Sequence, residues 1–165
     1  MVGSSPKEVV FAQAAEAALQ GAQLPQYNSF KIELAKRAIG KTNPVHRQHR
    51  GENPYCGDVV ELTLALDETE SKIADIKFEG AGYGLCLASA EFMAIAIKGK
   101  SITQALLIVE QFHEMVTGHT QFEPPWEKLN IIQGVSQYPM RVKCVTLAWH
   151  TLKVALGSVE TGAYL

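Results

Sequence analysis

The feature that most constrains the fold is a change of hydrophobic period at a run of glycines in the middle of the chain. Residues 60–66 alternate apolar and polar side chains, the two-residue period of a half-buried strand, and residues 73–78 repeat that alternation after a polar turn. The two segments therefore predict an antiparallel hairpin. Gly80, Gly82 and Gly84 end the alternation, and a helical pattern follows them.

Three helices are predicted after the glycines. Residues 85–98 combine good helix formers with apolar side chains throughout, which is typical of a largely buried helix. Ser101 and Gln104 form a capping-box pattern that opens a second helix, ending near Val116. A last helix is expected over residues 141–156, before a glycine. Strands and helices thus occupy separate blocks of the chain, which predicts an α+β fold.

The remaining segments give weaker patterns. Residues 29–39 place apolar side chains at three- and four-residue intervals, which predicts an amphipathic helix. Residues 44–55 are predicted as a polar loop. The stretch 119–139 is expected to be irregular, with one short helix around residues 127–133.

Length and composition are consistent with one principal domain. A chain of 165 residues with 47% hydrophobic content is large enough to bury a core. We assign that domain to residues 29–157, preceded by an N-terminal extension over residues 1–28 and followed by a C-terminal tail over residues 158–165.

Charge and hydropathy exclude several classes of partner. A net charge of -2 and a pI near 6.2 leave no strongly basic composition for binding nucleic acid. No apolar run reaches the 18 or so residues that a membrane-spanning helix needs, and the first residues lack the pattern of a secretory signal. We therefore expect a cytoplasmic protein that binds neither nucleic acid nor membrane.

Cysteines are the residues most suited to chemistry. Cys56, Cys86 and Cys144 are odd in number and widely spaced, which favours free thiols or metal ligands over a disulfide framework. In the string Cys56-Gly57-Asp58 a glycine permits a tight turn that presents a thiol and a carboxylate together. Cys144 lies near the predicted start of a helix, where the dipole favours the thiolate. From spacing alone, a lone cysteine is more often a small buried apolar residue than a functional one.

Several separated motifs occur along the chain in a recognisable order. They are Asn43-Pro44, Cys56-Gly57-Asp58, Phe78-Glu79-Gly80-Ala81-Gly82, Ala88-Ser89-Ala90, Lys98-Gly99-Lys100-Ser101 and Arg141-Val142-Lys143-Cys144. Together these motifs resemble those of the U-type iron–sulfur cluster assembly scaffold proteins, which include the IscU-like and SufU-like proteins and the NifU N-terminal domain. The resemblance runs from about residue 29 to 156. About twenty residues before Arg141 are similar to the insertion of the SufU-like branch.

The resemblance implies a small three-stranded antiparallel sheet with helices packed against it. It also implies a site built from three cysteines and an aspartate, of which Cys56, Asp58 and Cys144 match three. In the family this site holds zinc or an iron–sulfur cluster, and a site cysteine accepts persulfide sulfur from a cysteine desulfurase. Cluster-receiving apoproteins are the further partners implied. Arg141 and Lys143 match a basic pair of the family. Arg141 either has a role at the site or in docking, or is only a solvated charge at the start of a helix.

The resemblance departs from the family at one position. The family's middle cysteine follows the glycines, and Tyr83 stands there in this chain. A neutral phenol is a poor zinc ligand and cannot accept a persulfide. Cys86, three residues later, is either a substitute ligand or a buried core thiol. A water molecule, or one of the histidines His46 and His49, is the other candidate for the fourth ligand.

Three functions are compatible with these residues. The first is a cluster-assembly or sulfur-relay protein. The second, motivated by Tyr83, is a degenerate family member that docks on a cysteine desulfurase as a regulator without relaying sulfur. A thiol hydrolase using Cys56 and a histidine is the third, but nothing in the chain resembles a nucleophile elbow.

Overall fold

The three-stranded sheet is an antiparallel meander in a computed structural model that describes residues 38–157. Strand β1 (Arg47–Asn53) pairs with β2 (Asp58–Leu66), and β2 pairs with β3 (Ile73–Ala81), so the order in the sheet is β1-β2-β3. The predicted hairpin is therefore confirmed as β2 and β3. The predicted α+β class with a small antiparallel sheet is also confirmed.

Strand β1 corrects the prediction of a polar loop over residues 44–55. Its side chains are mostly polar, and only Gly51 and Asn53 are buried, so the strand shows no apolar alternation. Gly51 is required by close packing, because a Cβ there would lie 2.0 Å from Oγ1 of Thr151 in the last helix. Pairing with β2 is what makes this segment a strand, and pairing is not visible in the local sequence.

Four helical segments follow the sheet. Their bounds are α3 (Gly84–Ile97), α4 (Ile102–Val116), the 3₁₀ helix η1 (Glu127–Gln137) and α5 (Pro139–Ala155). All three predicted α-helices are confirmed, and Ser101 and Gln104 form the expected capping box of α4. The short helix predicted around residues 127–133 is a longer 3₁₀ segment. The helix predicted over residues 29–39 lies outside the described residues except at its last two positions, as do the extension and the tail.

Helix α5 begins two residues earlier than predicted, at Pro139. Proline is favoured in the first turn of a helix, because a backbone N–H at that position would have no partner within the helix and the φ of proline is already helical. The earlier start places Cys144 in the second turn of the helix, whereas the sequence predicted it in the first turn.

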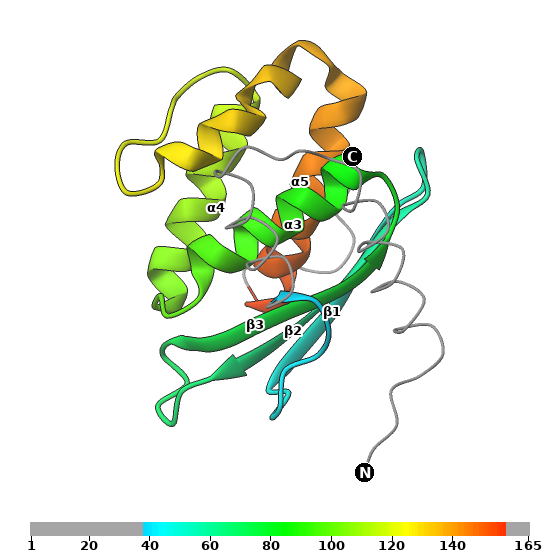
Figure 1. The fold of residues 1–165 in the computed structure, drawn as a ribbon. Coiled ribbons are helices and arrows are strands. Elements are labelled where there is room, and N and C mark those ends of the chain that lie inside the picture. Colours follow the sequence, from blue (N-terminus) through cyan, green and yellow to red (C-terminus); the bar gives the residue numbers. More distant parts are fainter. Residues whose placement is uncertain (1–37, 158–165) are drawn as a thin grey trace, which may run out of the picture. The chain divides into compact units, whose positions relative to one another are not determined.

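The helices cover one face of the sheet (Figure 1). Helix α5 packs against β1 and β2, α3 packs against β3 and α5, and α4 packs against α5 and η1. The core lies between these layers and includes Leu62, Met93 and Trp149, each at most 2% exposed. The indole of Trp149 stacks on Phe112 of α4 with 3.9 Å between ring centroids.

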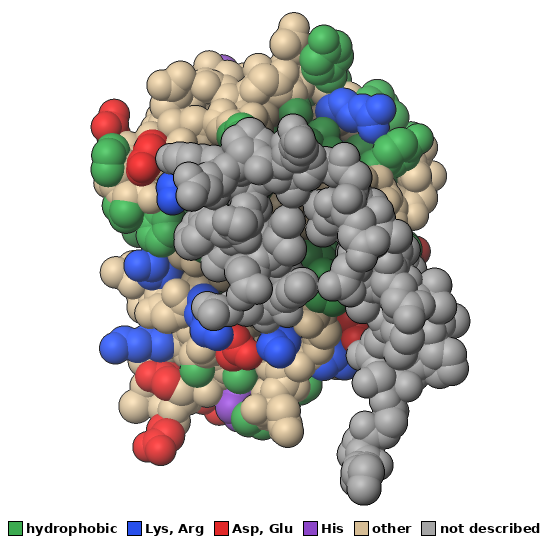
Figure 2. Space-filling model, viewed as in Figure 1, with side chains coloured by type: hydrophobic (Ala, Val, Ile, Leu, Met, Phe, Trp, Pro, Cys, Tyr) green, Lys and Arg blue, Asp and Glu red, His purple; other side chains and the backbone are tan. Residues whose placement is uncertain are grey.

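The surface carries charges of both signs. Figure 2 shows acidic and basic side chains interspersed on the face in view. None of the described helices is long and apolar enough to cross a membrane.

Candidate metal centre

The turn between β1 and β2 presents Cys56. The backbone N–H of Gly57 donates to the carbonyl of Asn53 at 2.8 Å, which closes the turn. Gly57 has a φ of +73°, a conformation that favours glycine. Asp58 is the first residue of β2. The thiol of Cys56 and the carboxylate of Asp58 therefore lie side by side at the end of the turn, as predicted from the Cys-Gly-Asp string.

The Asp58 carboxylate is fully buried and held from two sides. Its Oδ1 accepts a hydrogen bond from the backbone N–H of Tyr83 at 2.7 Å, and its Oδ2 accepts one from the Cys56 thiol at 2.9 Å. Gly82 allows this approach, because a Cβ at that position would lie 2.1 Å from Oδ1 of Asp58. The backbone bond fixes one oxygen and leaves the other directed at Cys56, an orientation that suits a metal ligand.

Cys144 reaches the same place from α5. Its Sγ lies 3.4 Å from Sγ of Cys56 and also 3.4 Å from the carbonyl of Met140, one turn earlier. A buried polar contact holds α5 against α3: Ser89 Oγ donates to the carbonyl of Val145 at 2.6 Å and accepts from Nε1 of Trp149 at 3.0 Å. This contact lies beside Cys144 in the sequence, so it helps fix which way the second turn of α5 faces.

The ligand atoms of Cys56, Asp58 and Cys144 all lie within 4.8 Å of one another. Neighbouring ligand atoms of a tetrahedral zinc site lie roughly 3.5–3.8 Å apart, given bonds of about 2.0–2.3 Å. The separations in this site start at 2.9 Å and stay within 4.8 Å, a range that brackets the tetrahedral one, so small side-chain shifts would admit an ion. Two thiolates and a carboxylate are a donor set that zinc accepts, so the residues fit such a metal.

Burial keeps Cys144 protonated in the metal-free site. Loss of solvation raises the pKa of the Cys144 thiol to about 12, and the hydrogen bonds with Cys56 and Asp58 and their charges act in the same direction. The prediction that the helix dipole favours the thiolate of Cys144 is therefore not supported for the metal-free protein. A bound cation would reverse this balance by displacing the proton.

Cys86 lies outside this group. It is fully buried in α3, and burial raises its pKa to about 12, with smaller contributions from the charges of Asp58 and Cys56. Its sulfur does not join the ligand atoms of the other three residues.

The two candidate histidines also lie outside the group of converging ligand atoms found among the described residues. His46 accepts a hydrogen bond through Nδ1 from the backbone N–H of Leu66, at the end of β2 opposite Asp58. His49 pairs with Leu62, four positions along β2 from Asp58.

Two cation–aromatic pairs lie beside the site. The guanidinium of Arg141 lies 4.8 Å from the ring centroid of Tyr83, and Nζ of Lys143 lies 4.6 Å from that of Tyr55. Both rings are exposed, Tyr55 by 70% and Tyr83 by 53%. Arg141 and Lys143 stand just before Cys144 in α5, while the tyrosines adjoin Cys56 and Asp58. Sequence reasoning singled out Tyr83 and the basic pair but gave no sign that they would stack.

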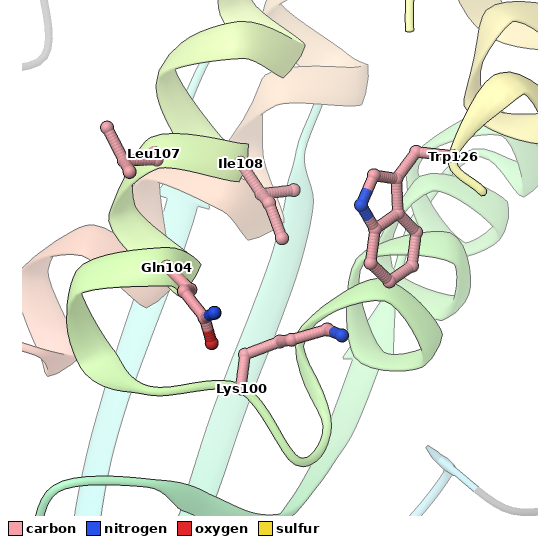
Figure 3. Close-up of a pocket in the computed structure, with 5 residues that line it drawn as sticks. All are labelled: Lys100, Gln104, Leu107, Ile108 and Trp126. Carbon is pink, nitrogen blue, oxygen red and sulfur yellow. The ribbon is translucent and has the colours of Figure 1, made fainter. Parts of the chain in front are cut away.

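A pocket elsewhere on the molecule is shown in Figure 3. Its lining residues are Lys100, Gln104, Leu107, Ile108 and Trp126, and Nζ of Lys100 lies 4.8 Å from the Trp126 ring centroid. None of them is a thiol, imidazole or carboxylate. Among the described residues, the potential metal-ligating side chains that converge in a group of three are Cys56, Asp58 and Cys144.

Comparison with known proteins agrees with this architecture. The model of the NifU-like N-terminal domain matches residues 35–160. The chain belongs to the NifU-like N-terminal domain family. This confirms the resemblance to the U-type scaffold proteins that the separated motifs indicated.

Two relatives are similar to this chain over more than 100 residues. An iron–sulfur cluster assembly scaffold protein IscU of Streptococcus pyogenes serotype M1 is 44% identical over 107 residues, 63% of this chain and 65% of that protein. The match thus spans just under two thirds of that relative. The zinc-dependent sulfurtransferase SufU of Bacillus subtilis is 39% identical over 112 residues, 67% of this chain and 74% of that protein.

A solved structure shares the fold. The crystal structure of FiSufU from Fervidobacterium islandicum AW-1 superposes with a TM-score of 0.68 at 35% identity, covering 77% of this chain and 93% of that one. The NifU-like family is thus supported by sequence and by structure.

Proposed function

We propose that this protein is an iron–sulfur cluster assembly protein whose Cys56–Asp58–Cys144 site binds metal and accepts sulfur. The observation that carries the proposal is the convergence of two thiols and a carboxylate, from residues 88 positions apart, within 4.8 Å. Relatives of this chain are named as cluster assembly scaffolds and as a zinc-dependent sulfurtransferase, and this donor set suits both roles.

Cys56 is the sulfur acceptor in this proposal. Cys86 and Cys144 are buried, whereas Cys56 is partly exposed. The Cys56 thiolate attacks the outer sulfur of a persulfide carried by a cysteine desulfurase. A new S–S bond forms on Cys56, the S–S bond of the donor breaks, and the donor cysteine leaves as a thiolate, so no external oxidant or reductant is needed.

The metal ligands in this proposal are Cys56, Asp58 and Cys144. Zinc is the resident metal that the named B. subtilis relative suggests, whereas an iron–sulfur cluster would be cargo passed to an apoprotein. A bound cation would stabilise the thiolate forms of both cysteines at neutral pH. Asp58 keeps its orientation through the backbone N–H of Tyr83, so its ligand oxygen is already placed.

A cysteine desulfurase is the proposed donor, and the residues around Cys56 form an exposed surface for it. Tyr55, Tyr83, Tyr138 and Met140 are each more than half exposed and lie next to site residues in the sequence or in space. Aromatic and methionine side chains of this kind are enriched at protein interfaces. Basic residues Arg141 and Lys143 lie over two of these rings.

Sulfur transfer is tested by incubating the protein with a bacterial cysteine desulfurase and cysteine under anaerobic conditions. Intact-mass measurement should show a gain of one sulfur on the wild type and on Cys86→Ser, but not on Cys56→Ser. Peptide mapping should place that sulfur on Cys56. Absence of the gain from the wild type, or its persistence in Cys56→Ser, would contradict the proposed acceptor role.

A second function is favoured by Tyr83. This residue presents an exposed ring beside the site, and no described thiol takes a third place next to Cys56 and Cys144. A protein that keeps the docking surface but regulates the desulfurase without taking its sulfur would have this arrangement. It predicts that desulfurase turnover changes on addition of the protein, equally for the wild type and for Cys56→Ser.

A further inference from the structure

The site supplies three ligand atoms, and a four-coordinate metal needs a fourth. Zinc sites with three protein ligands keep one position for a molecule from outside the chain. Among the residues that the structure describes, only Cys56, Asp58 and Cys144 have ligand atoms in the group. The second oxygen of Asp58 is already bonded to the N–H of Tyr83. The fourth ligand is therefore not supplied by these residues.

The open position is reached from the side of Cys56. Asp58 is 0% exposed and Cys144 2% exposed, so both are closed off by the protein. Cys56 is partly exposed, and the residues beside it in the site, Tyr55 and Tyr83, are 70% and 53% exposed. A ligand from solution thus meets Cys56 and the two tyrosines first.

Two positive charges lie beside this approach. Arg141 and Lys143 lie over the rings of Tyr83 and Tyr55, and the first turn of α5 contains no acidic residue to offset them. A divalent ion with two thiolates and one carboxylate carries one negative charge, whereas the two basic side chains carry two positive charges. One monoanionic ligand would make the whole group neutral, so an anion is favoured over a neutral ligand.

We propose that the fourth position of this site takes an anionic sulfur ligand from outside the chain, held by the charge of Arg141, which the Tyr83 ring positions. The simplest member of this class is a small thiolate, which binds as the anion after its proton passes to solvent. The proposal rests on the metal-binding part of the proposed function, and the choice of sulfur rests on the sulfur transfer proposed for Cys56. Tyr83 is a positioning residue here, since its ring acts through Arg141.

Cobalt(II) reports the ligands of such a site through its visible and thiolate-to-metal absorption bands. The wild-type protein, loaded with cobalt under anaerobic conditions, is titrated with 2-mercaptoethanol, and with ethylene glycol as a control without sulfur. Cys56 and Cys144 already give thiolate-to-cobalt absorption, which the thiol should increase to saturation and the glycol should leave unchanged. An unchanged cobalt spectrum at millimolar thiol would overturn the proposal while leaving the metal site itself intact.

Variants of Arg141 test whether its charge, and not a general structural effect, holds the thiol. Arg141→Gln should weaken the affinity for the thiol about tenfold, as expected for loss of one charge-assisted contact, while changing the affinity for cobalt less than threefold. Arg141→Lys should restore most of the thiol affinity. Arg50→Gln, an exposed arginine of β1 paired with Glu52, is the matched control and should behave as the wild type. Equal thiol affinities for Arg141→Gln and Arg50→Gln would overturn the role of Arg141.

Tyr83 provides the second pair of variants. Tyr83→Phe keeps the ring and should bind the thiol as the wild type does, whereas Tyr83→Ala should resemble Arg141→Gln. Tyr83→Cys should itself fill the fourth position, so that the absorption of a third thiolate is present without added thiol and 2-mercaptoethanol has no further effect. If thiolate-to-cobalt absorption, measured before thiol is added, is weaker in Cys86→Ser than in the wild type, Cys86 fills the position and the proposal is wrong. A protein that binds no cobalt at all would contradict both this proposal and the proposed metal site.

Discussion

Sγ of Cys56 lies 3.4 Å from Sγ of Cys144, although 88 residues separate them. The first comes from the turn that joins two strands, and the second comes from the second turn of the last helix. Asp58 bonds to Cys56 within the same group. The sheet and α5 thus create a coordinating group that neither element contains alone.

Gly82 determines whether Asp58 can occupy its place. A Cβ at position 82 would lie 2.1 Å from Oδ1 of Asp58, and Gly82 has a φ of +149°. Gly82→Ala should therefore displace the carboxylate and weaken zinc binding by at least about tenfold, the usual effect of disturbing the support of a ligand. Gly84→Ala is the matched control, because nothing lies within 4 Å of its added Cβ. Competition with a chelating dye measures both affinities, and equal values would contradict this role of Gly82.

Metal affinity should rise with pH. Burial raises the pKa of Cys144 to about 12, so this thiol is protonated throughout the range from pH 6 to 8 and must release its proton when zinc binds. Each proton released makes the apparent affinity about tenfold stronger per pH unit. Competition titrations at several pH values provide the slope. An affinity independent of pH would show that zinc binds elsewhere or without displacing a thiol proton.

Ser89 joins α3 to α5 through two buried hydrogen bonds. Ser89→Ala would remove the bond to the carbonyl of Val145 and leave Nε1 of Trp149 without its partner. The expected loss is about 1–3 kcal/mol in the free energy of unfolding, since an unpaired buried donor costs more than the bond itself contributes. Urea denaturation measures this loss. Ala88→Ser, at an exposed position of the same helix, is a control for the helix propensities of the two residues.

Glu91 makes stability depend on pH. Both of its carboxylate oxygens are buried without a hydrogen-bond partner among the described residues, and burial raises its pKa from 4.5 to about 7. Between these values the unfolded chain loses the proton while the folded protein keeps it, so stability falls as pH rises from about 4.5 to 7. Glu91→Gln should remove this slope and stabilise the protein at pH 8 by about 1–2 kcal/mol.

Thermal unfolding from pH 4.5 to 8 tests the role of Glu91. Glu114→Gln, at an exposed position of α4, should keep the wild-type pH dependence. The same slope in Glu91→Gln and the wild type would show that the Glu91 carboxyl is solvated in the folded protein.

Local patterns were sufficient for the elements that bury a regular apolar face. The alternation in residues 60–66 predicted β2, and Ser101 with Gln104 predicted the start of α4. Strand β1 was missed because its side chains are polar and its stability comes from pairing with β2 and from close contact between Gly51 and Thr151. These are tertiary effects that a local period does not encode.

The site could be predicted only in part. Cys56 and Asp58 are neighbours in the sequence, so their proximity follows from the turn, whereas the approach of Cys144 was implied by the family resemblance alone. The dipole argument for Cys144 was wrong for the metal-free protein because burial has the larger effect on its pKa. Stacking of Arg141 on Tyr83 could not be predicted, since it depends on how α5 docks beside the loop after β3.

Zinc content per chain tests the central claim most directly. After removal of metal with a chelator and reloading, elemental mass spectrometry should find one zinc bound by the wild type and by Cys86→Ser. Cys56→Ser, Asp58→Ala and Cys144→Ser should each lose it while remaining folded by circular dichroism. Full zinc occupancy in Cys144→Ser, or its loss in Cys86→Ser alone, would contradict a site shared by Cys56, Asp58 and Cys144.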